Sequence, residues 1–289
     1  MTGITVSQLW IYPIKSLKGI SLDSVQLEKR GFQYDRRWML VDKDYRFITQ
    51  RQHPKMALIE PSFEDDIMSY GLSVRAPDMP VLIVPYPDAQ IELYDEVEVT
   101  CWDDKVKAHH INTAIDNWFS EFLDMDCQLV YMPDTTIRPV DPDYALSDKG
   151  DDIASFSDGF PNLVISEASL SDLNNRVDID LTMNRFRPNI VLAGCVPYEE
   201  DRLGHFKLNQ IDFYAVKPCS RCVITTINPQ TGEKESPEPL LALSKYRKKN
   251  HKVFFGQNLL HKLTYLSDNR IHIGDKLEII KASDKLSFD

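Results

Sequence analysis

KPCSRCVITTINPQTG spans residues 217–232 and holds two cysteines, Cys219 and Cys222, separated by two residues. A zinc site would need two more ligands at comparable spacing, and the sequence offers no second CxxC or histidine pair of that kind. A thioredoxin-like motif would open a helix, whereas the β-branched run after Cys222 predicts a strand that begins at this cysteine. Cys222 would then lie beside Arg221, and a guanidinium stabilises the thiolate that a soft metal requires. The alternative is a pair of small buried cysteines, and this stretch alone does not decide between the two.

Basic residues elsewhere point to an anionic ligand near this thiol. Arg187 directly precedes Pro188, whose fixed geometry would present the arginine at the edge of a strand. Together with Arg221 it could clamp a phosphate, although an arginine in such a place is commonly a solvated surface charge. YPIKSLKG at residues 12–19 adds an ammonium, a hydroxyl and a glycine, but without the glycine pattern of a P-loop.

Two further arginines, Arg36 and Arg37, stand next to each other beside Asp35. Adjacent residues of a strand face opposite sides, so we expect only one of them to reach a ligand. The alternative is a surface salt bridge.

Composition describes an acidic globular protein with 43% hydrophobic residues and a net charge of −11. Such a charge argues against nucleic acid or an anionic membrane as a partner. The charge is uneven, since residues 10–51 carry +4, residues 185–222 carry +2 and the remainder carries −17. Five cysteines, an odd number without a secretion signal, indicate free thiols in the reducing cytoplasm. The most apolar run, residues 80–87, is far shorter than the ~20 residues that cross a bilayer.

The alternation of short apolar runs with turns predicts a mainly β protein with some α-helix, an α+β fold. In the first half we expect strands at residues 6–11, 37–42, 57–61, 71–76, 81–84 and 92–100. The helical period then places Ile115, Trp118, Phe119, Phe122 and Leu123 on one face of a helix capped by Thr113.

After a polar connection at residues 133–159, the second half is again rich in strands. Ser166 or Ser169 could cap a helix that carries Leu170, Leu173 and Val177. We expect strands at residues 162–165, 189–193, 206–216, 222–227, 270–273 and 276–280, and a short helix at residues 239–248.

Seven stretches, in this order and spacing, resemble the MOSC family with its amino-terminal β-barrel domain, the group that includes the mitochondrial amidoxime-reducing component and its bacterial relatives. They are YPIKSLKG (12–19), DRRWMLVD (35–42), TQRQHP (49–54), LVISEASLSDLN (163–174), RFRPNIVL (185–192), CSRCVITTINPQTGE (219–233) and FGQNL (255–259). The resemblance implies a β-barrel domain at residues 1–130 and a MOSC β-barrel domain at residues 131–289.

The resemblance also implies a pterin-based molybdenum cofactor, Mo-molybdopterin, held between the two domains. Cys222 matches the family's metal ligand, whereas Cys219 matches a position that is not usually a ligand. Other matching positions contact the cofactor, and with Arg221 they form the predicted site: Lys15, Ser16, Arg36, Ser157, Asp158, Ser166, Arg187 and Asn189.

The activity implied by the resemblance is reduction of N-hydroxylated compounds such as hydroxylamines, amidoximes and N-hydroxylated bases. Asp158 is the candidate for supplying a proton to the leaving oxygen. The animal relatives carry an amino-terminal membrane anchor that this sequence lacks, so we expect a soluble protein. We expect a monomer by default. It also lacks the cysteines of an iron–sulfur domain, so electrons are expected from a separate flavoprotein, ferredoxin or b-type cytochrome. The alternatives are a sulfur carrier with a persulfide on Cys222 and a cofactor carrier without turnover.

Overall fold

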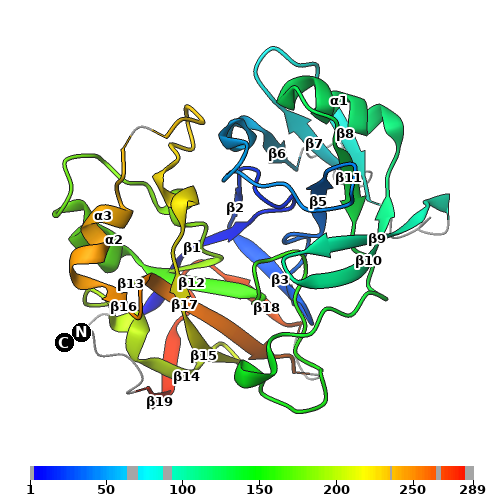
Figure 1. The fold of residues 1–289 in the computed structure, drawn as a ribbon. Helices are drawn as coiled ribbons and strands as arrows, with labels where there is room; N and C mark the ends of the chain where they lie inside the picture. The colour runs from blue at the N-terminus through cyan, green and yellow to red at the C-terminus, as the bar shows by residue number, and fades with distance from the viewer. Residues whose placement is uncertain (1–2, 64–70, 87–92, 235, 265–267, 284–289) are drawn as a thin grey trace.

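The computed structural model describes residues 3–63, 71–86, 93–234, 236–264 and 268–283. These residues form mainly strands with three α-helices, which confirms the predicted α+β class. Two lobes stand side by side, one around the long strands β15 and β17 and the other around α1 (Figure 1). In the part of the chain described, no helix is long and apolar enough to cross a membrane.

The larger lobe is built on a nine-stranded sheet with the order β19-β14-β15-β17-β12-β13-β1-β2 and with β16 paired to β17. β12 and β13 run parallel, and β1 pairs antiparallel with β13. The first strands of the chain therefore join a sheet made largely from the second half. The division at residue 130 stays a prediction. The strands are β1 (Thr5–Ile11), β2 (Ile20–Leu22), β12 (Asn162–Ser166), β13 (Ile190–Ala193), β14 (Leu203–Leu208), β15 (Ile211–Ser220), β16 (Lys248–Lys249), β17 (Lys252–Lys262) and β19 (Leu277–Ala282).

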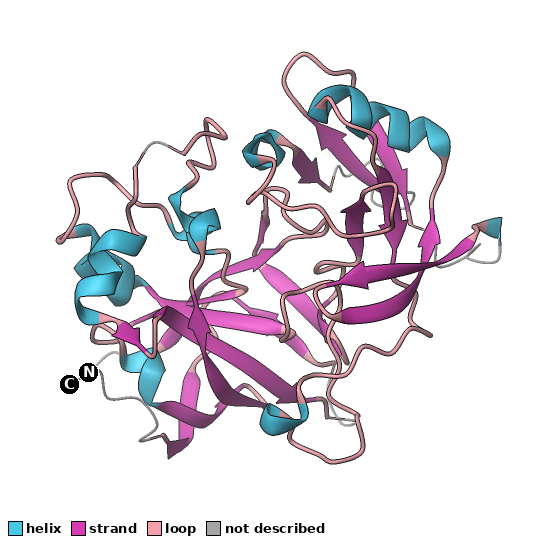
Figure 2. Ribbon diagram, in the orientation of Figure 1, coloured by secondary structure: helices cyan, strands magenta, loops and turns pink. Residues whose placement is uncertain are grey.

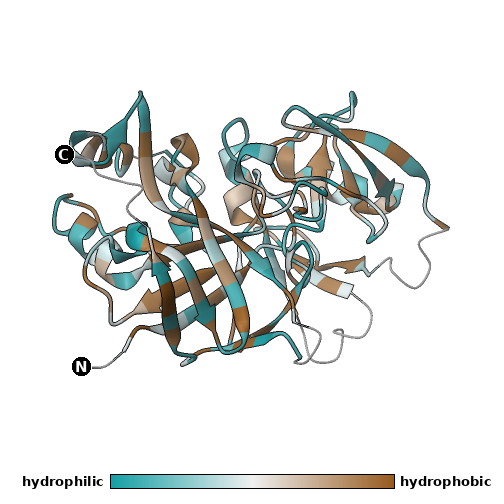
Figure 3. Ribbon diagram, turned by 90° about the horizontal axis from the view of Figure 1, so that it is seen from below, coloured by the Kyte–Doolittle hydropathy of each residue, from teal (hydrophilic) through white to brown (hydrophobic). Residues whose placement is uncertain are grey.

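The neighbouring strands β12 and β13 are buried almost throughout, which explains their nearly continuous apolar sequences. Val164 of β12 packs into a core shared with β3 (Ser24–Glu28) and β18 (Arg270–His272). Its neighbour Ile165 points the other way, into a core with α2 (Glu167–Asn174) and α3 (Leu240–Tyr246). Figure 3 shows hydrophobic residues, in brown, distributed along the strands of both lobes. Because successive side chains of a strand point to opposite faces, β12 contributes residues to two hydrophobic layers.

The smaller lobe contains a four-stranded sheet of order β5-β11-β10-β9 and a three-stranded sheet of order β6-β7-β8. A further sheet, β18-β3-β4, joins the two halves of the sequence. Helices lie at the periphery of both lobes (Figure 2). The remaining strands are β4 (Gly31–Phe32), β5 (Trp38–Val41), β6 (Glu60–Ser62), β7 (Gly71–Arg75), β8 (Leu82–Pro85), β9 (Glu96–Cys101), β10 (Asp104–His110) and β11 (Gln128–Tyr131).

The helix α1 (Thr113–Leu123) carries the predicted apolar face, and all five predicted apolar residues are buried. Its cap differs from the prediction, because the side chain of Asn112, not Thr113, accepts the hydrogen bond from the Ile115 backbone N–H. The predicted alternative caps of α2 are resolved in favour of Ser166, whose side chain accepts from the Ser169 N–H.

One prediction near the cysteines is wrong. Residues 223–226 form a short 3-10 helix, Val223–Thr226, and not a strand, with Cys222 as the extended residue before it. The side chains of Thr225 and Thr226 donate to backbone carbonyls three residues back. These local bonds offset the strand propensity of β-branched residues.

Candidate cofactor site

A cavity lies where segments of both halves of the chain meet, and it collects almost every residue that the sequence nominated. Ser166 is the exception. Its hydroxyl lies 2.8 Å from Glu200 and caps α2, and Ser166 is not among the residues that line the cavity, so its contact with a cofactor stays a prediction. The predicted residues that line the cavity are Lys15, Ser16, Arg36, Ser157, Asp158, Arg187, Asn189, Arg221 and Cys222.

Lys15 enters the cavity from the turn that follows β1. Ser16 adopts a left-handed backbone, and any Cβ on Gly19 would lie 2.5 Å from the ring of Tyr12. Glycine is therefore required for the turn to close against this ring. The buried Lys15 ammonium donates to the Phe156 carbonyl at 2.7 Å and pairs with Asp158 at 2.6 Å.

Two arginines from different halves of the chain stack on the same buried tyrosine. The guanidinium groups of Arg36 and Arg187 lie 4.3 and 4.2 Å from the ring centre of Tyr12. Arg36 also donates to the carbonyl of Arg187 and to the side chain of Asn189. Burial, followed by the charge of Arg36, lowers the pKa of Arg187 to about 10. An anion bound here would relieve the repulsion between the two cations.

The prediction that only one arginine of the adjacent pair faces the cavity is confirmed. Arg37 points away and donates to the Met132 carbonyl and to Tyr131 and Asp134. Arg36 turns inward because it has a left-handed backbone at φ 50° just before β5, which strand alternation alone does not produce.

Both cysteines line the cavity, yet their neighbours differ from the prediction. The Arg221 guanidinium donates to Cys219 Sγ at 3.0 Å, not to Cys222. Burial raises the pKa of the Cys219 thiol in spite of this contact. Cys222 Sγ instead accepts from Arg51 Nε at 3.5 Å. The cationic partner of Cys222 therefore comes from the smaller lobe.

Asp158 is held as a carboxylate, which weighs against its predicted role as a proton donor. Loss of solvation raises the pKa of Asp158, but the charges of Lys15 and Arg51 and the hydrogen bonds from Lys15 and the Trp102 N–H outweigh it. Together they hold the pKa of Asp158 well below its ordinary value. Trp102 Nε1 donates to Asp158 at 3.2 Å. A carboxyl that holds its charge this firmly is a poor acid at neutral pH.

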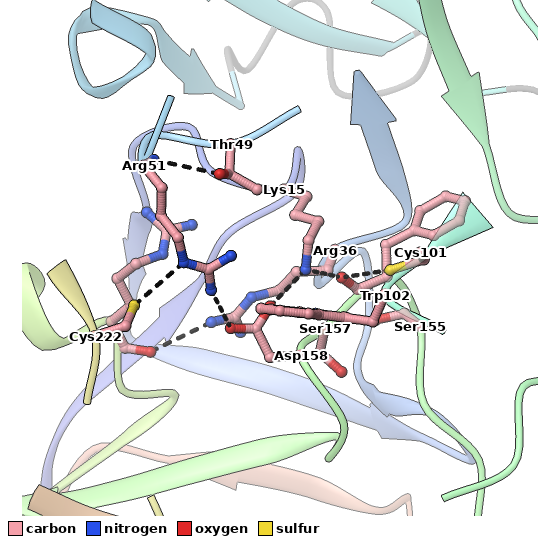
Figure 4. A network of polar contacts seen from close by, with 12 residues as sticks. Lys15, Arg36, Thr49, Arg51, Cys101, Trp102, Ser155, Ser157, Asp158 and Cys222 are labelled. Carbon is pink, nitrogen blue, oxygen red and sulfur yellow. Dashed lines mark hydrogen bonds and ion pairs between the residues drawn. The ribbon is translucent and has the colours of Figure 1, made fainter. Parts of the chain in front are cut away.

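Sequence reasoning missed two residues that contact the lining of this site, Arg51 and Trp102. Arg51 lies inside TQRQHP, one of the stretches that carried the family resemblance, so the signal was present without a role attached. Trp102 lies in the turn between β9 and β10, and its sequence context offers nothing that points to a site. Figure 4 shows both residues with Lys15, Asp158 and Cys222.

The residues present fit an anionic, polar cofactor. Besides the cations, the lining contains buried polar atoms without a hydrogen-bond partner: Ser157 Oγ, Asn162 Oδ1 and Arg221 Nε. Buried polar groups are rarely left unpaired, so these atoms indicate a missing polar ligand. Within the described residues, no three His, Cys, Asp or Glu side chains come together as a metal site.

Two family models match the chain. The model of the MOSC N-terminal beta barrel domain matches residues 3–126, and the model of the MOSC domain matches residues 151–278. The mitochondrial amidoxime reducing component 2 of Bos taurus is 34% identical over 84% of this chain and 72% of its own. The chain belongs to the MOSC family.

Two further relatives match over most of this chain. The mitochondrial amidoxime-reducing component 1 of Homo sapiens is 29% identical over 96% of this chain and 83% of its own. The molybdenum cofactor sulfurase of Oryza sativa subsp. japonica is 27% identical over 96% of this chain but only 35% of its own. A solved Bordetella bronchiseptica structure covers 42% of this chain at 16% identity, with a TM-score of 0.29.

Proposed function

We propose that this protein is a molybdenum-cofactor-dependent reductase of N-hydroxylated compounds. The observation that carries the proposal is a cavity in which the Cys222 thiol lies among cations from both halves of the chain. The names of the relatives, amidoxime-reducing components and a molybdenum cofactor sulfurase, support a function connected with this cofactor.

Mo-molybdopterin would be held by residues with distinct tasks. Cys222 would bind the metal as a thiolate. Arg36, Arg187 and Lys15 would neutralise the phosphate, which guanidinium groups match with paired hydrogen bonds. Polar contacts to the pterin would come from Ser16, Ser157, Asn189 and Arg221. When bound, the cofactor supplies the two-electron chemistry that breaks an N–O bond.

The overall reaction with an amidoxime consumes two electrons and two protons. The N–O bond breaks, one proton goes to the nitrogen, which becomes the N–H of an amidine, and the other goes to the hydroxyl, which leaves as water. We propose that the electrons arrive from a separate electron-transfer protein, a flavoprotein, ferredoxin or b-type cytochrome. Because Asp158 stays ionised, we propose that it orients Lys15 and Arg51 and that water supplies the protons.

A second function, sulfur transfer through a persulfide on Cys222, is favoured by one observation, the match to the rice sulfurase over 96% of this chain. Cofactor binding without turnover is the remaining alternative. We also keep a cytoplasmic monomer as a proposal.

Turnover distinguishes these functions. Protein purified from a host that makes the cofactor is incubated with benzamidoxime and a reduced dye, and benzamidine is quantified. We expect product from the wild type and from Cys219→Ala, and none from Cys222→Ala. A cofactor-loaded wild type that forms no product would establish a carrier, and a persulfide on molybdenum-free protein would establish sulfur transfer.

A further inference from the structure

A compact turn fixes the position of Arg51. The hydroxyl of Thr49 accepts from the Arg51 backbone N–H at 3.2 Å, and the Gln52 N–H donates to the Thr49 carbonyl at 3.0 Å. Gln50 ties the turn to the opposite wall of the site, since its side-chain amide donates to the Ser16 carbonyl at 2.6 Å. This turn corresponds to TQRQHP at residues 49–54.

Three groups hold the guanidinium of Arg51 at the rim of the cavity (Figure 4). Its Nε donates to Cys222 Sγ at 3.5 Å, and its Nη2 lies 3.8 Å from Asp158 Oδ2. Its Cζ lies 4.4 Å from the ring centre of Trp102, and the indole N–H of Trp102 donates to Asp158. The side chain is 23% exposed, so it is anchored and still open to a ligand.

The other cations of the site are arranged differently. Arg36 and Arg187 are stacked together on Tyr12, and Lys15 is turned to the Phe156 carbonyl and Asp158. Arg51 instead borders the sulfur proposed as the metal ligand. A guanidinium has five N–H donors, more than its contacts to Cys222 and Asp158 use. A substrate whose N–O bond is broken at the metal must bring its oxygen into this space.

We propose that Arg51 is a further catalytic residue, whose guanidinium donates hydrogen bonds to the substrate oxygen that is removed. This proposal rests on the proposed function and names the group that recognises the oxygen. As the N–O bond breaks, electrons come from the separate electron-transfer protein and protons from water, and the oxygen leaves as water. Arg51 keeps its own protons throughout and stabilises the negative charge that develops on the oxygen.

Trp102 and Asp158 act as positioning residues for this guanidinium. The indole face restricts Arg51 to a plane, and the carboxylate fixes its rotation within that plane. Phenylalanine at position 102 keeps an aromatic face, whereas leucine keeps bulk without one. Comparing Trp102→Phe with Trp102→Leu therefore distinguishes aromatic stacking on Arg51 from packing by bulk alone.

Equilibrium binding tests the recognition of oxygen without turnover. Calorimetry on the oxidised holoenzyme, with no electron donor, compares benzamidoxime with benzamidine, which lacks only the oxygen. We expect Arg51→Gln to lower the affinity for benzamidoxime by about ten- to hundredfold, the range for a hydrogen bond to a charged group. Benzamidine, a cation, should bind Arg51→Gln at least as tightly as wild type. Arg51→Lys should bind benzamidoxime with intermediate affinity.

Arg46→Gln is the matched control, because it removes the same charge from an exposed position outside the cavity. It should leave the affinity for both ligands unchanged. The proposal would be overturned if Arg51→Gln lowered the affinity for both ligands equally, or if it left the affinity for benzamidoxime unchanged. Should Arg51→Gln fail to fold or to retain molybdenum, Arg51→Lys provides the same comparison of the two ligands.

Kinetics add a second criterion. Removal of one donor to a developing oxyanion lowers kcat by about 10²- to 10³-fold, and we expect this of Arg51→Gln. Trp102→Leu should lower kcat/KM for benzamidoxime by roughly tenfold, and Trp102→Phe should restore most of it. A wild type that binds benzamidoxime but never reduces it refutes the proposed function, while the binding comparison still decides the role of Arg51. An Arg51→Gln variant as fast as wild type refutes the role of Arg51 alone.

Discussion

Replacing Ser166 by alanine shows whether its side chain serves as the cap of α2 or as a contact to the cofactor. The Ser166 hydroxyl accepts from the Ser169 N–H at 3.1 Å and donates to Glu200 at 2.8 Å. Loss of an N-cap typically costs about 1 kcal/mol. Glu200 is fully buried, and removing one of its donors adds roughly 1–2 kcal/mol. We therefore expect Ser166→Ala to lower the free energy of unfolding by about 2–3 kcal/mol.

Urea denaturation measures this loss, and metal analysis of the same samples reports the molybdenum content. Ser166→Thr keeps the hydroxyl and should recover most of the stability. In a Glu200→Gln background, Ser166→Ala should cost less, because the charged acceptor is gone. The reasoning fails if Ser166→Ala changes the stability by less than 0.5 kcal/mol, roughly the scale of an ordinary surface substitution, and releases molybdenum from folded protein.

Three further predictions concern stability, each measured by urea denaturation. Burial lowers the pKa of His261 to about 4, so its protonation favours the unfolded chain. Stability should fall as the pH drops from 6.5 toward 4, by up to about 3 kcal/mol, and His261→Gln should flatten this dependence. Asp201→Asn removes the countercharge of the buried Arg247, 2.5 Å away, and should cost about 3–5 kcal/mol; a loss below about 1 kcal/mol would contradict a buried ion pair. Asn112→Ala should cost about 1 kcal/mol and Asn112→Ser almost nothing, whereas equal effects would show that the cap of α1 is unimportant.

The sequence predicted the site better than it predicted the local structure around it. Arg36, Arg187 and Cys222 were nominated from their residue types and from the family resemblance, and the fold brings them to one cavity. The partner of Cys222 was predicted as Arg221 because the two are adjacent in sequence. Adjacency along an extended backbone turns side chains apart, so Arg221 reaches Cys219 and the thiol of Cys222 meets Arg51 from the other lobe.

The longest strand that the structure describes, β17, was not predicted from the sequence, because its pairing is long-range. The 11-residue strand β17 lies between β15 and β12, yet its sequence KVFFGQNLLHK has no clean alternation. Phe255 packs in the core with α2 and α3, whereas Leu259 packs in the core on the opposite face. Gly256 lies between them with φ 84°, where a Cβ would meet Ile165. A strand buried on both faces shows no polar period from which it can be predicted.

Metal and pterin analysis of three proteins tests the central claim most directly. Wild type, Cys219→Ala and Cys222→Ala are purified from the same cofactor-competent host, and molybdenum and pterin are measured per protein chain. We expect close to one equivalent of each in wild type and in Cys219→Ala, and loss of molybdenum in Cys222→Ala. Molybdenum retained in Cys222→Ala, or a wild-type protein that carries a persulfide and no molybdenum, would contradict the assignment of Cys222 as the metal ligand.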